Sequence, residues 1–145
     1  MMIPVKIKLD PEAKLPEYKS PAASGADIYA LVKEPMEINP GETVLVPTGM
    51  YIEIPEGYEA QIRPRSGLAL KHGITLLNTP GTIDSDYRGE IKIIMTNLGK
   101  DPFTVTKGMR IAQMIFNKIY RGHFINTDEL NSSERNDGGF GHSGI

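Results

Sequence analysis

The sequence contains no cysteine, which excludes disulfide bonds, thiolate metal sites and cysteine nucleophiles. It also lacks any apolar run near the roughly 18 residues that a membrane-spanning helix needs. Residues 1–10 alternate apolar with charged side chains, so they lack the apolar segment of a signal peptide. We therefore expect a cytoplasmic protein with no membrane partner.

Neither sign of charge dominates, because 16 Lys and Arg stand against 18 Asp and Glu, for a formal net charge of −2. No overall field attracts nucleic acid, so we expect no nucleic-acid partner, and any anion site must come from local Arg and Lys side chains. The sequence also has no Gly-x-Gly-x-x-Gly motif and no Walker-type loop. These absences argue against the common mononucleotide-binding and dinucleotide-binding folds.

Fifteen glycines and eleven prolines divide the chain into short segments, and alternating apolar and polar residues between them predict strands. One such segment, 111–116, also fits a helical face, but its short length favours a buried strand. A helical turn or two is expected at 66–71. Many short strands predict an all-β domain over residues 1–130, built as a jelly roll, a sandwich or a barrel. The predicted strands are residues 5–9, 43–46, 50–54, 58–62, 90–96, 103–106 and 111–116.

The last residues, 131–145, contain four glycines, one Phe and almost nothing else that is apolar. Such a segment cannot bury enough surface to offset the entropy of ordering it. We expect a flexible C-terminal lid, in which Phe140 could stack on a base and Arg135 could meet a phosphate. The alternative is an ordinary disordered terminus.

Two internal segments carry the residue types that phosphate chemistry needs. Arg65, Ser66 and Gly67 would offer a guanidinium, a hydroxyl and free backbone N–H groups to a phosphate, although a helix cap with solvated arginines is the alternative. Asp84 and Asp86 lie two residues apart in a Gly-bounded segment, 78–90. A carboxylate there could deprotonate a water or help to hold Mg²⁺, whereas ordinary turn chemistry is the alternative.

Polar residues also occur in two places where apolar ones are expected. Arg110 and Gln113 interrupt the otherwise apolar segment 108–115, so each needs a polar partner. Asp27 enters a strand after a glycine turn. A purely structural role is the alternative for Arg110 and Gln113, and turn capping is the default explanation for Asp27.

Together, and in this order, five segments resemble the motif set of the trimeric dUTP diphosphatase (dUTPase) family. The most specific matches are PRSGLA at 64–69 and GTIDSDYRG at 81–89. The resemblance implies a β jelly roll, a homotrimer and active sites shared between subunits, with the third segment coming from a neighbour and the tail from the remaining subunit. The five segments are residues 24–30, 64–69, 81–90, 108–115 and 135–144.

The resemblance also implies an activity. It is the Mg²⁺-assisted hydrolysis of dUTP to dUMP and pyrophosphate, which limits uracil in DNA and supplies dUMP for thymidylate synthesis. Asp84 would activate the water that attacks the α-phosphorus, and Mg²⁺ would be held mainly by the substrate phosphates. Asp27 would either touch the water shell of that ion or pair with Arg110.

Further roles carry over by position, and each remains an expectation of the resemblance. Tyr87 would lie against the deoxyribose and exclude a ribose 2′-hydroxyl, while backbone groups of the hairpin would reject cytosine and thymine. The residues implied at the phosphates are Arg65, Ser66, Gly67, Gln113 and Arg135. Those implied at the base are Asn78, Gly81, Thr82, Ile83 and Lys92, with Phe140, Gly141, His142 and Ser143 closing over the site.

The tail departs from the family pattern in two places. Asn136 replaces a usual Gly, and His142 and Ser143 replace Ser and Thr, so we expect phosphate contacts that differ in detail. Two other functions remain open as alternatives. One is a dCTP deaminase, which resembles the family in fold, and the other is a non-catalytic nucleotide-binding module on the same jelly roll.

Overall fold

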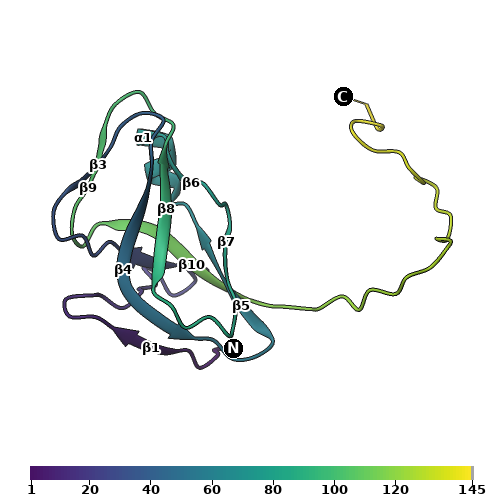
Figure 1. The fold of residues 1–145 in the computed structure, drawn as a ribbon, viewed down its shortest axis with the longest axis horizontal. Coiled ribbons are helices and arrows are strands. Elements are labelled where there is room, and N and C mark those ends of the chain that lie inside the picture. Colours follow the sequence, from purple (N-terminus) through teal and green to yellow (C-terminus); the bar gives the residue numbers. More distant parts are fainter. Residues whose placement is uncertain (145) are drawn as a thin grey trace.

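The computed structural model describes residues 1–144 as an all-β body with one short helix and a long C-terminal tail (Figure 1). Two four-stranded antiparallel sheets, ordered β1-β4-β8-β6 and β2-β10-β5-β7, make most of the body, and β3 pairs with β9. No helix in this part of the chain is long and apolar enough to cross a membrane. The elements are β1 (Lys6–Leu9), β2 (Ala26–Tyr29), β3 (Met36–Ile38), β4 (Thr43–Glu53), β5 (Tyr58–Arg63), α1 (Ser66–His72), β6 (Ile74–Leu76), β7 (Gly81–Ile83), β8 (Ile91–Asn97), β9 (Phe103–Val105) and β10 (Arg110–Lys118).

Alternation along the strands builds the core between the sheets. In β8, Ile91, Ile93 and Met95 are buried while Lys92 is exposed, which is the period of two that a strand imposes. Strand β10 adds Ile111, Ala112 and Met114 from the other sheet, which confirms the strand expected at 111–116. Each fully buried Ile or Met side chain contributes about 1.5–3 kcal/mol relative to an exposed one.

Strand β4 differs from expectation, because one eleven-residue strand replaces the two predicted at 43–46 and 50–54. The register with β8 shifts between Pro47 and Met50, so a bulge lies inside the strand. The carboxylate of Glu90 accepts the backbone N–H groups of Thr48 and Gly49 at the bulge, each at 3.3 Å. Pairing therefore continues past the irregularity, and the prediction of two separate strands is wrong.

The chain leaves the body after β10, which ends at Lys118. Residues 120–137 are all exposed, and Figure 1 shows this tail extending away from both sheets. Large apolar side chains lie along it, with Tyr120, Phe124, Ile125 and Leu130 each more than three-quarters exposed.

Candidate active site

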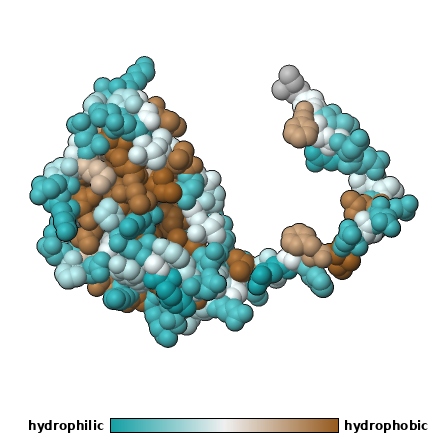
Figure 2. Space-filling view, in the orientation of Figure 1, coloured by the Kyte–Doolittle hydropathy of each residue, from teal (hydrophilic) through white to brown (hydrophobic). Residues whose placement is uncertain are grey.

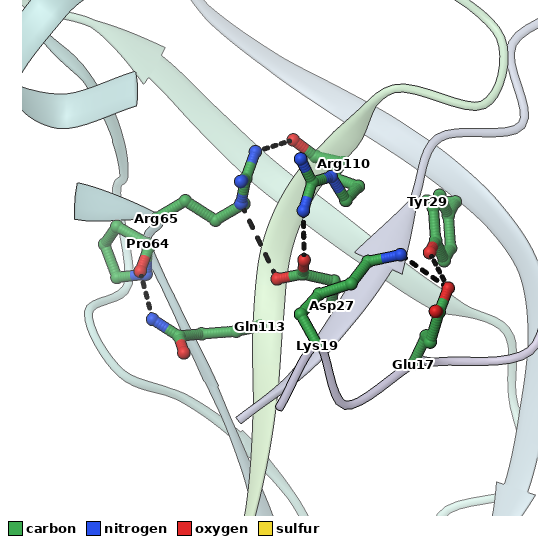
Figure 3. A network of polar contacts seen from close by, with 8 residues as sticks. All are labelled: Glu17, Lys19, Asp27, Tyr29, Pro64, Arg65, Arg110 and Gln113. Atoms are coloured by element: carbon green, nitrogen blue, oxygen red, sulfur yellow. Dashed lines mark hydrogen bonds and ion pairs between the residues drawn. The ribbon is translucent and has the colours of Figure 1, made fainter. Parts of the chain in front are cut away.

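A charged cluster gathers where β2, β5 and β10 lie side by side (Figure 3). Arg110 Nη1 donates to Asp27 Oδ2 at 2.9 Å, and Arg65 Nε lies 3.6 Å from Asp27 Oδ1. Arg65 Nη1 also donates to the backbone oxygen of Arg110 at 3.0 Å. Two guanidinium groups thus share one carboxylate that is 13% exposed, and the excess positive charge suits an anion.

Gln113 lies beside this cluster, at the position in β10 that pairs with both Asp27 and Arg63. Its Nε2 donates to the backbone oxygen of Pro64 at 2.9 Å. A Cβ added at Gly25 would lie 2.2 Å from Gln113 Oε1, so only glycine leaves room for this amide. The contact explains why a glycine precedes the strand that carries Asp27.

Ser66 and Gly67 follow the cluster as the first residues of α1, and both are exposed. Arg65, with extended backbone angles, occupies the N-cap position, so Ser66 is not the cap of this helix. A Cβ added at Gly67 would meet no atom within 4 Å, which shows that the surface here is open. The structure thus brings Asp27, Arg65 and Gln113 to one end of the sheet, and Ser66 follows Arg65 directly at the start of α1.

A second polar network adjoins the cluster, and no sequence pattern marks it. Glu17 bridges to Asp27 through backbone hydrogen bonds, and its carboxylate accepts from Lys19 Nζ at 2.6 Å and from Tyr29 Oη at 2.7 Å (Figure 3). These hydrogen bonds hold the pKa of the Glu17 carboxyl below its ordinary value. Lys14 Nζ also lies 5.2 Å from the centre of the Tyr29 ring. Only the folded chain brings these residues, far from β10 in sequence, beside Arg110.

A pocket of about 440 Å³ lies at the turn between β7 and β8. The chain reverses there, with Tyr87 N donating to Asp84 O at 3.1 Å and Arg88 Nη1 donating to Ser85 O at 2.6 Å. Asn78 lies close by, since a Cβ added at Gly81 would be 3.2 Å from its Nδ2. The pocket is lined by the predicted residues Thr82, Ile83, Asp84, Tyr87 and Lys92, and by Leu45, Glu90 and Ile91, which sequence analysis did not select.

The charged cluster and this pocket lie at opposite ends of β5. In the pairing of β5 with β7, Ile83 faces Ala60 and Gly81 faces Ile62, so Asp84 extends toward Glu59. Arg65 is six residues beyond Glu59 along an extended chain, which corresponds to about 20 Å at roughly 3.3 Å per residue. A single chain therefore does not bring Asp84 to the Arg65 cluster.

The predicted tail residues contact neither the charged cluster nor the β7–β8 pocket. Phe140 is fully exposed, and Arg135, Gly141, His142 and Ser143 are exposed as well. Arg135 Nε instead donates to the backbone oxygen of Gly138 within the tail. Asn136 takes the place of the usual Gly at a φ of 45°, in the left-handed region that Asn tolerates better than most residues.

Few carboxylates lie near the charged cluster, and Asp27 is the one that both arginines contact. Among residues 1–144, no three His, Cys, Asp or Glu side chains come together as a metal site. Both carboxylate oxygens of Asp27 face arginines.

The family model described as dUTPase matches residues 11–144 of the chain. The chain belongs to the dUTPase family. It is 60% identical, over the whole length of both chains, to the deoxyuridine 5′-triphosphate nucleotidohydrolase of Caldanaerobacter subterraneus subsp. tengcongensis. It is 49% identical to that of Fusobacterium nucleatum, with 98% of this chain and 97% of the relative covered. The predictions of a dUTPase-family enzyme and of its β jelly roll are therefore confirmed.

Solved dUTPase structures share the fold. The dUTPase of Staphylococcus bacteriophage 80alpha with dUPNHPP is 26% identical, covers 99% of this chain and all of its own, and has a TM-score of 0.90. A mutant dUTPase from phage phi11 of S. aureus, described with a structural Mg(II) ion, is 21% identical with a TM-score of 0.80 and supports the fold alone. Its alignment covers 88% of this chain and 99% of that one.

Proposed function

We propose that the chain hydrolyses dUTP to dUMP and pyrophosphate, with Asp84 as the general base. The observation that carries the proposal is the β7–β8 pocket, which places an exposed carboxylate beside a tyrosine and an exposed lysine. The Asp84 carboxylate takes a proton from a water molecule as its oxygen attacks the α-phosphorus. The bond from that phosphorus to the bridging oxygen breaks, and pyrophosphate leaves with the electron pair. General-base assistance of this kind contributes about 10²–10⁴-fold in rate.

The walls of the pocket suit a pyrimidine deoxynucleoside. Ile83, Leu45 and Ile91 supply apolar contact, while Thr82 and the strand backbone supply hydrogen-bonding groups. We propose that these groups, with Asn78 and Lys92, bind the uracil edge and that Tyr87 lies against the deoxyribose. A site that hydrogen-bonds its substrate rejects a mismatched base strongly, because buried polar groups are then left unpaired.

The triphosphate would lie at the charged cluster. Arg65, Ser66, Gly67 and Gln113 would hold its oxygens, and Arg135 with Ser143 and His142 would add contacts from the tail. Negative charge on the phosphates would be neutralised by Mg²⁺ when it is bound, with Asp27 available to its water shell. Because Arg65 and Arg110 already share Asp27, the guanidinium groups are oriented before a phosphate arrives.

We propose a homotrimer with shared active sites. In one chain the Arg65 cluster and the Asp84 pocket lie about 20 Å apart, at roughly 3.3 Å per residue of extended strand, so a complete site would need two chains. Two surfaces support assembly. The first is the outer face of the β4–β8 sheet, where exposed Leu45 pairs with Ile94. The backbone N–H of exposed Leu77 donates to the backbone oxygen of the same Ile94. Figure 2 shows apolar side chains gathered on this side of the body. The second is the tail, whose exposed apolar side chains would pack on another chain in such an assembly.

A substrate panel tests the activity. With Mg²⁺, dUTP should yield dUMP and pyrophosphate by chromatography, while dCTP, dTTP and UTP should remain largely intact, and EDTA should slow the reaction. Release of ammonia from dCTP would overturn the assignment in favour of a deaminase. Nucleotide binding without any product would favour the non-catalytic module.

Mixed trimers test the shared sites. The Arg65→Ala and Asp84→Asn variants should each be poorly active, but refolding them together in equal amounts should restore activity. In a random mixture, half of the clusters and half of the hairpins are intact, so about a quarter of the sites recover in a symmetric assembly. The control, Asp84→Asn refolded with Asp84→Ala, should stay inactive. Absence of recovery in the first mixture would show that each site lies within one chain.

We further propose that the protein acts in the cytoplasm, where it would limit uracil in DNA and supply dUMP for thymidylate synthesis. The absence of cysteine suits that reducing compartment.

A further inference from the structure

The ring of Tyr87 folds back over Gly89. A Cβ added at Gly89 would lie 2.3 Å from Tyr87 Oη and 2.5 Å from Tyr87 Cζ, distances that side-chain carbons do not adopt. The backbone of Gly89 is outside the left-handed region, so the requirement for glycine is one of space. Any side chain at position 89 must therefore push the tyrosine ring out of its present position.

The hydroxyl end of the same ring is also held by Glu90. Tyr87 Oη donates to the backbone oxygen of Glu90 at 3.0 Å. The Glu90 carboxylate accepts from the N–H groups of Thr48 and Gly49, at the bulge of β4. Glu90 thus links the tyrosine hydroxyl, through its own main chain and side chain, to β4, the strand that pairs with β8.

We propose that Gly89 and Glu90 are positioning residues that fix the Tyr87 ring and thereby set how strongly the pocket rejects a ribonucleotide. The inference rests on the proposed dUTP hydrolysis, in which this ring lies against the sugar. A ring whose hydroxyl end packs on Gly89 and bonds to Glu90 leaves no space for a 2′-hydroxyl. A ring released from Gly89 or Glu90 rotates about its side-chain bonds and admits the larger sugar.

The Gly89→Ala variant tests the first contact. Because the three atoms nearest to the new methyl group all belong to the movable tyrosine ring, the protein should fold normally. The ratio of kcat/KM for dUTP to that for UTP should fall by about tenfold, since hydroxyl discrimination depends on a fixed wall. Gly122→Ala is the matched control, because a Cβ there meets only the Phe124 ring, at 3.7 Å, and the ratio should not change.

A double-mutant cycle separates this inference from the proposed function. In a Tyr87→Ala background, Gly89→Ala should have no further effect on the ratio. If Tyr87→Ala itself leaves the ratio unchanged, the sugar role of Tyr87 in the proposed function is wrong. If Tyr87→Ala lowers the ratio but Gly89→Ala does not, the positioning role of Gly89 is overturned and the proposed function stands.

Substitutions at Glu90 test the second contact. Glu90→Ala should lower the dUTP-to-UTP ratio, and Glu90→Gln, which keeps an oxygen acceptor for the two N–H groups, should restore most of it. Thermal unfolding measured in parallel identifies a purely structural role, which would lower Tm without changing the ratio. That result would remove Glu90 from the proposal.

Discussion

Replacing the Asp84 carboxylate by an amide, in Asp84→Asn, is expected to lower kcat for dUTP by about 10²–10⁴-fold. The amide keeps the size of the side chain but cannot take a proton from the attacking water. Affinity should change little, because Asp84 lies exposed in the β7–β8 pocket rather than at the charged cluster. Calorimetric titration with a non-hydrolysable dUTP analogue and steady-state kinetics measure the two quantities separately.

Asp86→Asn provides the matched control. The substitution removes the same charge as Asp84→Asn, and Asp86 is also exposed. Asp86 does not line the pocket, however. Its kcat should stay within about threefold of the parent, since surface substitutions away from a site usually have small effects. Equal losses in the two variants would show that hairpin charge, and not a base at Asp84, supports the reaction. Full activity of Asp84→Asn would remove the proposed base altogether.

Deleting residues 133–145 is expected to lower kcat/KM for dUTP by about 10²-fold or more, because a base–aromatic stack alone contributes about 1–3 kcal/mol. The deletion removes Phe140, Arg135 and the hydroxyl of Ser143 together. Tm should change little, because residues 133–137 are exposed and the core lies entirely before Lys118. Differential scanning calorimetry and kinetics on the truncated chain measure both effects.

Point variants refine this result. Phe140→Ala should reproduce much of the loss, whereas Asp128→Ala, an exposed substitution before the deleted segment, should not. Unfolding of the truncated protein would assign the tail a structural role. Full activity with a normal Tm would instead leave the tail without a part in the reaction.

Local patterns in the sequence predict most of the body. The alternation at 90–96 reports burial at its start, where Ile91 and Ile93 are buried on either side of exposed Lys92, because every second residue of a strand faces the core. The continuous strand Thr43–Glu53 could not be foreseen from residues 43–54 alone, since its bulge is bridged by Glu90 from another part of the chain. Strand β7, with three residues, is too short to show a period.

In the candidate site, too, some features can be predicted from local sequence and others depend on residues far apart in the chain. Residue type and resemblance select Arg65, Asp84 and Gln113, because their chemistry can be recognised in sequence. The sharing of Asp27 by two arginines depends on three strands meeting, and the role of Gly89 depends on where a tyrosine ring folds. Long-range geometry of this kind has no local signature.

The length of the tail gives the proposed lid a thermodynamic property that a shorter segment would lack. Phe140 lies 22 residues beyond Lys118, where the last strand ends. A flexible chain of that length has a root-mean-square span of about 25 Å. Such a tether holds its end near the body at an effective concentration in the millimolar range, whatever the amount of enzyme. A lid with only millimolar intrinsic affinity would then be closed about half the time, and it would still open quickly enough to release product.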